Sequence, residues 1–226
     1  MTISLYARLF ALSGLLLSGC VPGQIVTVTI YDTPDAFVRL ETDRTIDQNS
    51  GHTHPAYLSP EHMASLLGGI VFEEPWAKLP LYDDLNQPRR HPAFTEPEIA
   101  LFAPLLATAL GKATPEELVT FYHSTTHSGT QREVISGGLY LQGEDLHIVL
   151  ANYRSPTHFS ADLGVADTTD DRLSPLRALA PQRGRLAFEP REAARETADA
   201  GIAKWFREDR REVVVQYNAV TPRAPR

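Results

Sequence analysis

The stretch from Arg132 to Arg154, REVISGGLYLQGEDLHIVLANYR, decides the fold. Two segments rich in β-branched, aromatic and other apolar residues, REVISGGLYLQ and LHIVLANYR, lie on either side of the short polar sequence GED. This pattern predicts a β-hairpin, because such residues favour extended backbone and a turn containing glycine reverses the chain. Gly137 and Gly138 indicate a bulge in the first strand. The run Leu146–Ala151 has apolar residues on both of its faces, which predicts a strand inside a sheet.

Further strands are predicted towards both ends of the chain. Residues 25–41, IVTVTIYDTPDAFVRLE, begin with β-branched residues, turn at Pro34 and return through apolar residues, so they predict a second hairpin. RLAFE at 185–189 and EVVVQY at 212–217 are shorter strand candidates. The N-terminal, central and C-terminal strands together predict an antiparallel sheet.

Four segments have the pattern of helices, one of them running from about residue 191 to residue 207. The other three begin with residues that can satisfy the free amide groups of a first helical turn. These starts are Ser59 before Pro60, Thr95 with Glu98 three residues later, and Thr114 before Pro115 with Glu117 three residues after Thr114. Pro104 is expected to bend the second helix. The residues expected to face the core are Ile99, Phe102, Leu106 and Leu110 in the second helix, and Leu118, Phe121 and Tyr122 in the third.

Composition is consistent with one globular domain of the α+β class. Of the 226 residues, 42% are hydrophobic and 22% are charged, and the chain is long enough to bury a sizeable core. We predict a single domain over residues 25–220, with an antiparallel sheet packed against several short helices, and a flexible tail at 221–226. Residues 154–182 predict a long surface connection. Lys and Arg number 21 against 28 Asp and Glu, a balance that argues against a nucleic-acid partner.

The first twenty residues, MTISLYARLFALSGLLLSGC, differ from the rest of the chain. They contain one charged residue, Arg8, followed by an apolar run from Leu9 to Leu17. This run is too short to cross a bilayer as a helix, and it has the length of the apolar core of a secretory signal peptide. An export signal is therefore predicted.

Leu17, Ser18, Gly19 and Cys20 resemble the lipobox of bacterial lipoprotein precursors, in which Leu, Ser or Ala, and Gly or Ala precede a cysteine. In that family a peptidase cuts before the cysteine, whose sulfur carries diacylglycerol and whose amine is acylated by a fatty acid such as palmitate. The resemblance implies that residues 1–19 are a removed signal peptide and that Cys20 is the site of lipid attachment. A signal or transmembrane segment with a coincidental cysteine is the alternative.

The same resemblance implies a location. Lipoproteins retained in the inner membrane of many Gram-negative bacteria often have Asp where this chain has Val21, so the outer membrane, facing the periplasm, is favoured. Residues 20–24 would form the lipidated N-terminus and a tether that reaches less than about 20 Å, which keeps the domain near the lipid headgroups. Cys20 is the single cysteine, so the domain is expected to rely on its core without a disulfide.

Four histidines are candidates for metal chemistry. His52 and His54 would share one face of an extended chain, and His123 and His127 would share one face of a helix. Together they could form a four-histidine zinc site. The alternatives are a polar loop ahead of a helix for the first pair and a polar helix end for the second, where Ser124 occupies the position at which a zincin-like site needs Glu. His147 is expected to be a hydrogen-bonded residue of the sheet.

No catalytic motif is complete, because the chain has neither G-x-S-x-G nor a glycine-rich phosphate loop. We therefore assign no catalytic residue, metal ligand or cofactor, and Cys20 is the one predicted site residue. The sequence predicts a lipid-anchored envelope protein that acts as a binding, assembly or structural component. Its expected partners are the membrane, through the lipid, and another envelope protein or the cell wall. A lipid-anchored, metal-dependent hydrolase that uses the histidine cluster is the alternative.

Overall fold

The computed structural model describes residues 25–46, 51–74, 89–128, 131–158, 171–179, 184–195 and 211–222. The predicted signal peptide and the lipobox with Cys20 lie outside these residues. Within the described ranges, no helix has the length and apolar character needed to cross a membrane. Both sheets and both α-helices of this part of the chain contribute to a common hydrophobic core.

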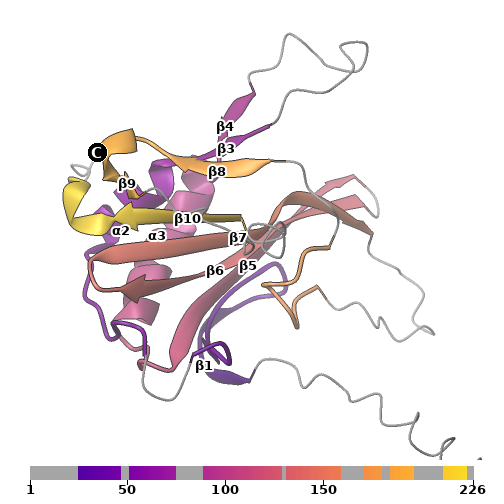
Figure 1. Cartoon of the computed structure of the whole chain (residues 1–226). Helices are drawn as coiled ribbons and strands as arrows, with labels where there is room; N and C mark the ends of the chain where they lie inside the picture. The colour runs from indigo at the N-terminus through magenta and orange to yellow at the C-terminus, as the bar shows by residue number, and fades with distance from the viewer. Residues whose placement is uncertain are drawn as a thin grey trace, which may run out of the picture.

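A large antiparallel sheet forms the body of the molecule (Figure 1). It has seven strands among the described residues, in the order β1-β2-β5-β6-β7-β10-β9. Their bounds are Val26–Asp32 (β1), Ala36–Thr42 (β2), Glu117–Ser128 (β5), Gln131–Gln142 (β6), Asp145–His158 (β7), Ala194–Arg195 (β9) and Arg211–Gln216 (β10). The sheet thus combines N-terminal, central and C-terminal strands, as the sequence predicts.

The remaining elements lie beside and behind this sheet (Figure 1). A second antiparallel sheet has the strand order β4-β3-β8, and two α-helices pack against each other on one face of the larger sheet. The bounds are Pro60–Gly68 (α2), Ile70–Glu73 (β3), Arg90–Pro92 (β4), Glu96–Leu110 (α3), Arg185–Phe188 (β8) and two 3₁₀ turns, Arg191–Ala193 and Tyr217–Ala219. The α+β class is confirmed in its broad form, but "several short helices" overstates the two α-helices of the described chain.

The central hairpin is confirmed as the β6–β7 pair. It turns at Gly143, whose φ of +64° lies in the left-handed region that glycine adopts without strain. The pairing of β6 with β7 changes register between Ser136 and Gly137, next to the predicted bulge, but the extra residue lies in the other strand. Ser136 pairs with Asn152 and Gly137 with Leu150, so the bulged residue is Ala151 of β7. β7 lies between β6 and β10, so it is also the interior strand that its apolar run predicts.

Two of the predicted helix starts are confirmed by their hydrogen bonds. The Ser59 hydroxyl accepts from the amide of His62 at 3.2 Å at the start of α2. At the start of α3, the Thr95 side chain accepts from the Glu98 amide, and the Glu98 carboxylate accepts from the Thr95 amide at 2.8 Å. The helix α3 continues through Pro104 to Leu110.

The third predicted helix is wrong, because residues 117–128 form strand β5. The capping signal does make its contact, since the Thr114 amide donates to Glu117 Oε2 at 2.8 Å, but the chain makes only one turn there. The residues that follow are mainly β-branched and aromatic, and β2 and β6 bind them on both sides. Hydrogen bonds to strands on both edges stabilise the extended conformation. The helix-start signal alone does not oppose it, because no residues with helical periodicity follow.

The helix predicted from residue 191 to residue 207 is also wrong at its start. Arg191–Ala193 is a 3₁₀ turn, and Ala194–Arg195 pairs with Val214 and Val215 of β10 as strand β9. Residues 196–210 lie outside the described residues. The surface connection predicted for 154–182 begins later than expected, because β7 continues to His158.

The two faces of the large sheet differ. Side chains alternate along a strand, so Val119 and Phe121 of β5 pack in the core against the helices, whereas Leu118, Thr120 and Tyr122 point to the opposite side. We call this opposite side the open face. It holds the candidate site.

Candidate functional site

Residues 171–179, here called the cover segment, lie across the open face. Their main attachment is Asn152, which is 1% exposed and whose amide group binds two backbone groups of the segment. Asn152 Nδ2 donates to the Arg177 carbonyl at 2.8 Å, and its Oδ1 accepts from the Leu179 amide at 2.8 Å. The Ser136 hydroxyl donates to the Pro175 carbonyl, also at 2.8 Å.

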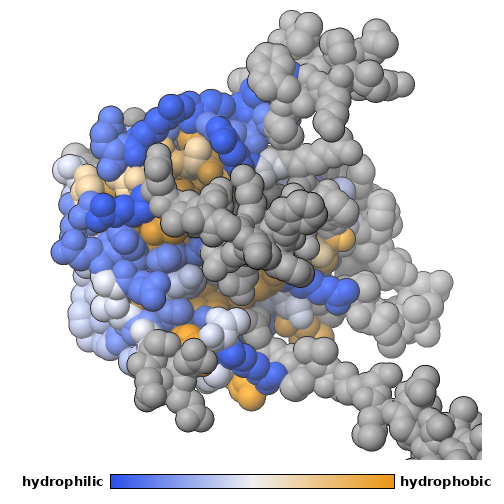
Figure 2. Space-filling view, in the orientation of Figure 1, coloured by the Kyte–Doolittle hydropathy of each residue, from blue (hydrophilic) through white to orange (hydrophobic). Residues whose placement is uncertain are grey.

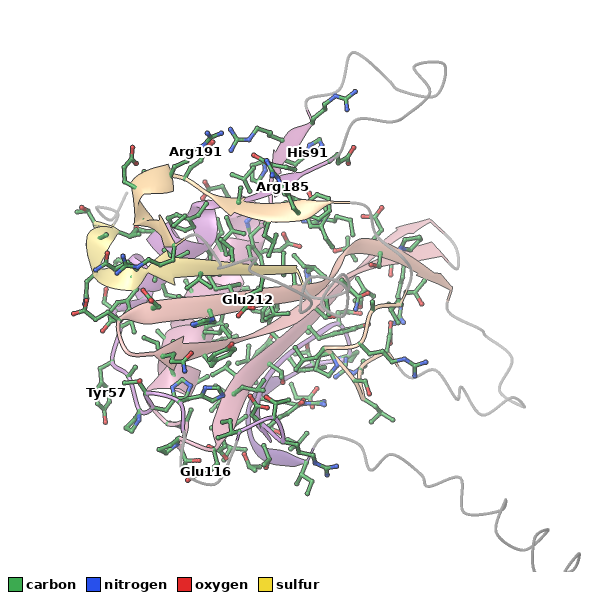
Figure 3. All side chains as sticks on the ribbon, viewed as in Figure 1. Tyr57, His91, Glu116, Arg185, Arg191 and Glu212 are labelled. Atoms are coloured by element: carbon green, nitrogen blue, oxygen red, sulfur yellow. The ribbon has the colours of Figure 1, made fainter. Side chains whose placement is uncertain are left out.

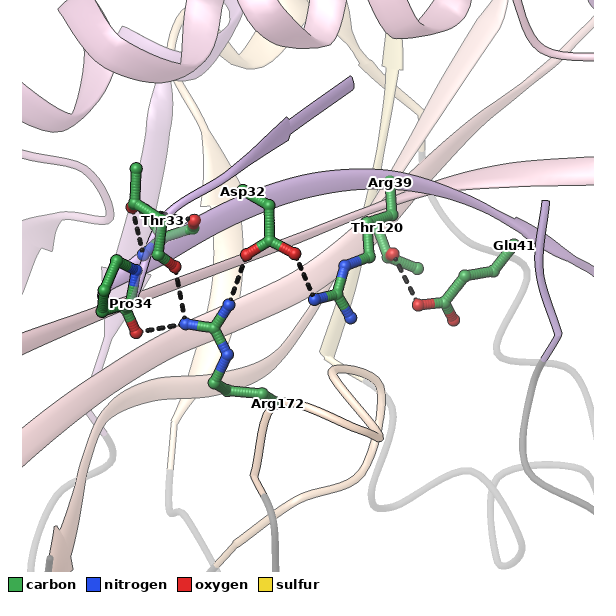
Figure 4. Close-up of polar contacts among 8 residues, drawn as sticks. Asp32, Thr33, Pro34, Arg39, Glu41, Thr120 and Arg172 are labelled. Carbon is green, nitrogen blue, oxygen red and sulfur yellow. Dashed lines mark hydrogen bonds and ion pairs between the residues drawn. The ribbon is translucent and has the colours of Figure 1, made fainter. Parts of the chain in front are cut away.

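Arg172 fastens the other end of the cover segment to the β1–β2 turn (Figure 4). Its guanidinium binds Asp32 Oδ1 at 2.6 Å and donates to the carbonyls of Thr33 and Pro34. The other carboxylate oxygen of Asp32 accepts from Arg39 at 2.9 Å. The cover segment is therefore held at both ends by side chains of the sheet and of its turns.

A cavity of about 190 Å³ lies between the cover segment, the sheet and the loop that follows β2. One part of its lining is aliphatic and the other is polar. The lining residues are Asp43, Thr45, Ile46, Gly51, His52, Leu118, Gly138, Tyr140, Gln142, Val149 and Leu176. Pockets of this amphipathic kind are the usual form of small-molecule sites, although this one is smaller than most.

Gly138 leaves room for this cavity. A Cβ atom at this position would lie 3.0 Å from a methyl group of Leu176 and 3.2 Å from one of Leu118. Both leucines line the cavity, so a larger residue would fill the space between them. The neighbouring Gly137 is different, because its Cβ would lie 2.0 Å from the carbonyl oxygen of Val149 in the sheet itself.

Asp43 and His52 form the polar end of the cavity. His52 Nε2 lies 3.0 Å from Asp43 Oδ2, and both side chains are 9% exposed. Burial alone would raise the pKa of Asp43, but hydrogen bonds from His52 and from Thr45 outweigh it and hold the pKa at about 2. Asp43 is therefore an anion at every physiological pH.

This charge decides the proton position on His52. A carboxylate only accepts hydrogen bonds, so the imidazole must donate from Nε2. In the neutral imidazole the other nitrogen, Nδ1, is then an acceptor, and no partner for it lies among the described residues. A lone pair held in place by an Asp–His pair can accept a hydrogen bond from a hydroxyl or amine group.

A series of stacked rings continues from His52 along the open face. The ring of Tyr140 lies 4.3 Å from that of His52 and 4.6 Å from that of His147, measured between centroids. Glu212 Oε1 accepts from the Tyr140 hydroxyl at 3.1 Å and from His147 Nδ1 at 2.8 Å. Carboxylates thus hold both ends of this stack, and His147 is the hydrogen-bonded sheet residue that the sequence predicts.

Two buried polar groups near this end of the molecule lack partners among the described residues. His54 is 7% exposed, its ring lies 5.6 Å from the His52 ring, and neither of its nitrogens is hydrogen-bonded there. Burial, with the nearby His52, lowers the pKa of His54 to about 4, so the ring is neutral at neutral pH. Glu41 binds Thr120 through Oε1 while its Oε2 is unpaired, and burial raises its pKa.

The predicted pair His52 and His54 therefore does come together, but His123 lies elsewhere. The His123 side chain faces the helices, whereas the cavity that holds His52 lies on the opposite face of the sheet. Leu118, the residue of β5 that lines this cavity, is five residues before His123, or about 17 Å away along the strand. The backbone of His127 belongs to β5, and its side chain lies outside the described part. Among the described residues, no group of three or more His, Cys, Asp and Glu side chains is placed to hold a metal ion.

His123 belongs to a separate cluster around Glu98, which is 3% exposed at the start of α3. The Glu98 carboxylate accepts from His123 Nδ1 at 3.2 Å and binds Arg154 at 2.6 Å. Burial alone would raise the pKa of Glu98, but hydrogen bonds from His123 and Thr95 and the charge of Arg154 hold it at about 2. Arg154 has a φ of 47°, a strained value for a residue with a side chain. This cluster fastens α3 to the sheet.

Reasoning from sequence did not single out Asp43 or Tyr140 for chemistry. Asp43 lies nine residues before its partner His52, in a polar stretch without regular spacing, so no local pattern connects the two. For Tyr140 a signal was present, because Gly138, Tyr140 and Gln142 alternate along one strand and must share a face. Cys20, the one site residue predicted from the sequence, lies outside the described residues.

Comparisons of the chain with protein-family models, with curated proteins and with solved structures find no match.

Proposed function

We propose that this chain is a lipid-anchored cell-envelope protein whose domain binds a small amphipathic molecule on the open face of its sheet. The lipobox Leu17–Cys20 supports the anchor. The observation that carries the binding role is the cavity of about 190 Å³ with an Asp–His pair at one end and aliphatic side chains at the other. Its partners are then the membrane, through the lipid on Cys20, and the ligand, with another envelope protein or the cell wall as a further candidate.

The lining indicates what the cavity would accept. The Asp43 carboxylate and the His52 lone pair, which has no partner within the described part of the chain, favour a ligand that donates hydrogen bonds, such as an amine or a hydroxyl compound. Leu118, Val149 and Leu176 favour an apolar remainder of a few carbon atoms. The same anion opposes a carboxylate ligand, because two like charges in a partly buried site repel.

The membrane part of the proposal is tested by intact mass measurement on the protein extracted from the membranes of a Gram-negative host. We expect a chain that begins at Cys20 and carries diacylglycerol and one further acyl chain. The Cys20→Ser variant is expected to have neither the cut nor the lipid. A wild-type protein without lipid would contradict the anchor, and it would leave the ligand site to be judged separately.

The ligand part is tested by NMR titration of the protein with three probes of equal length: n-butylamine, 1-butanol and butyrate. We expect millimolar binding of the amine and the alcohol, with the largest amide shifts at Thr45, Gly138 and Tyr140, and weaker binding of butyrate. Gly138→Val, which fills the cavity, is expected to abolish these shifts. Butyrate binding as tightly as butylamine would contradict the proposed chemistry of the site.

The described residues give no comparable support to the metal-dependent hydrolase. His52 and His54 lie together, but His123 is engaged by Glu98 on the other face of the sheet. We therefore favour binding over metal-assisted hydrolysis.

A further inference from the structure

The first strand of the large sheet leaves apolar side chains in water. β1 pairs with β2, and its other edge has no partner strand among the described residues. Ile25, Val26 and Val28 are 58%, 42% and 41% exposed. Figure 2 shows hydrophobic surface at the lower edge of the view, where Figure 1 places β1. Apolar residues gathered at one exposed edge mark a contact surface.

Tyr57 adds an exposed aromatic ring towards the same end of the molecule. It is 84% exposed and lies against Gly111, just after α3. A few residues after Gly111 the chain reaches Glu116, whose carbonyl accepts a hydrogen bond from the Asp43 amide. The amide of the preceding residue, Thr42, donates to the Ile25 carbonyl. In Figure 3, Tyr57 and Glu116 lie at the lower end of the molecule, opposite Arg191 at the upper end.

The sequence that leads into β1 carries no charge. Residues 9–31 contain no Asp, Glu, Lys, Arg or His, so β1 lacks charged residues until Asp32. Charged side chains are the usual protection of an exposed sheet edge, and they would also resist transfer out of water. Their absence from this stretch of sequence allows β1 to enter an apolar environment.

The length of chain before β1 identifies the occupant. Five residue steps separate Cys20 from Ile25, a reach of about 18 Å at full extension. A lipid on Cys20 would hold this residue at the membrane surface, so Ile25 would lie within that distance of the headgroups. A bilayer is then closer to β1 than any partner that must diffuse to it.

We propose that Ile25, Val26 and Val28 dock onto the lipid surface that holds Cys20, with β1 at the level of the headgroups and Tyr57 towards the same end of the domain. This inference rests on the proposed lipid anchor. It goes further, because an anchored domain on a loose tether would not need to touch the bilayer. Docking fixes which end of the domain faces the membrane.

The test uses the chain's single cysteine. In the lipidated protein the sulfur of Cys20 is a thioether, so Val28→Cys introduces the one free thiol, which is labelled with the environment-sensitive dye NBD. The protein is reconstituted into vesicles of phosphatidylethanolamine and phosphatidylglycerol. We expect a blue-shifted emission that is quenched by nitroxide-labelled lipid. The matched control is the same dye at Arg191→Cys, which is expected to remain unshifted and unquenched.

A second change tests the apolar character of the edge. Adding Val26→Glu to the labelled Val28→Cys protein is expected to reduce the quenching, because a carboxylate resists leaving water. Equal quenching in both proteins would mean that tether length alone sets the position of β1, and it would overturn the inference.

Flotation of the vesicles separates the two proposals. Protein that floats with the vesicles while the dye at position 28 reports water retains the anchor and overturns the docking. A blue shift without quenching by lipid would mean that another protein chain covers β1, which also overturns it. Protein that does not float contradicts the anchor itself.

Discussion

At the scale of single residues, His54 links burial to pH. Its folded-state pKa of about 4 lies below the 6.5 of the free side chain, so between these values the unfolded chain binds a proton that the folded chain does not. Stability is therefore complete above pH 6.5 and falls as the pH drops towards 4. We expect His54 to account for about 2 kcal/mol of this loss, allowing for partial screening.

The measurement is urea denaturation of the wild type and of His54→Leu from pH 7.5 to pH 4. The variant should lack the His54 contribution to the fall of the unfolding free energy with pH. Its unfolding free energy relative to that of the wild type should therefore rise as the pH falls. At pH 7 the change should be close to neutral, since it removes two nitrogens that have no partner among the described residues. An identical slope in both proteins would count against the explanation.

Substitution by alanine is predicted to have different effects at the neighbouring positions Gly137 and Gly138. Gly137→Ala places a methyl group 2.0 Å from a carbonyl oxygen of the sheet, which cannot move without breaking strand pairing, and should cost about 3 kcal/mol. Gly138→Ala places its methyl group 3.0 Å from the end of the Leu176 side chain and 3.1 Å from the Val119 carbonyl oxygen, much looser contacts than those at Gly137, and should cost about 1 kcal/mol while narrowing the cavity. Thermal unfolding of both variants, compared directly, tests this order.

For single residues, the sequence predicts the role of a side chain when its partners lie close to it in the sequence. His147 as a hydrogen-bonded sheet residue and Ser59 as a helix cap are confirmed. The cap depends on a neighbour in the same turn, whereas the partner of His147, Glu212, comes from β10 and was not predicted. The pairing of Asp43 with His52 was not predictable, because the two residues meet only after β2 and the loop behind it close over the sheet. A short spacing can reveal a pair of residues, but a cavity lined by five separate segments leaves no such pattern in the sequence.

At the scale of elements, β5 shows how a correct local contact can suggest the wrong structure. Thr114 and Glu117 form the contact of a helix start, yet Val119 and Phe121 belong to a strand that is bound by other strands on both sides. The β-branched and aromatic residues from Val119 to Tyr122 favour a strand, and both of its faces are buried. A cap signal specifies one turn, whereas the periodicity of the following residues specifies the element.

The start of α3 is held to the sheet by charge. Glu98→Gln keeps the shape of the side chain but removes its charge towards Arg154 and His123, and should cost about 2 kcal/mol at pH 7. The folded pKa of about 2 lies below the usual 4.5, so this contribution is complete above pH 4.5 and is lost as the pH falls towards 2. The difference between wild type and variant, followed by denaturant titration, should therefore shrink in that range and stay constant above it.

The cover segment depends on Asn152, a buried side chain whose amide group makes two hydrogen bonds to the backbone of the segment. Asn152→Ala should cost about 2 to 3 kcal/mol, because the Leu179 amide loses its acceptor inside the structure. Limited proteolysis should then cleave within residues 171–179 much faster than in the wild type. Ser65→Ala, which removes an exposed hydrogen bond on α2, is the control and should leave the cleavage rate unchanged.

At the scale of the whole molecule, the core is predicted to stabilise the fold without covalent links. The single cysteine precedes the described residues, and the α-helices and sheets that those residues form share one core. Adding reducing agent should therefore leave the thermal midpoint of the mature chain unchanged in calorimetry. A lower midpoint under reducing conditions would reveal a disulfide between two copies of the chain.

The α+β class and the central hairpin were predictable because they follow from composition and from residues close in sequence. Sheet order was not, since β2 pairs with β5 across a long insertion that contains both α-helices. The open face and its cavity depend on that order, because Leu118, Gly138 and Val149 come from three adjacent strands.

The position of β1 has a mechanical consequence. Its first residues lie directly after the proposed tether, and its hydrogen bonds to β2 run across the strand axis, as in any antiparallel pair. When a ligand or partner pulls the domain away from an anchored Cys20 along that axis, the force acts in shear on all of these bonds at once. A force across the strands would instead break the same hydrogen bonds one after another, at a much lower value. Because the tether continues along the axis of β1, it can transmit force without unfolding the domain.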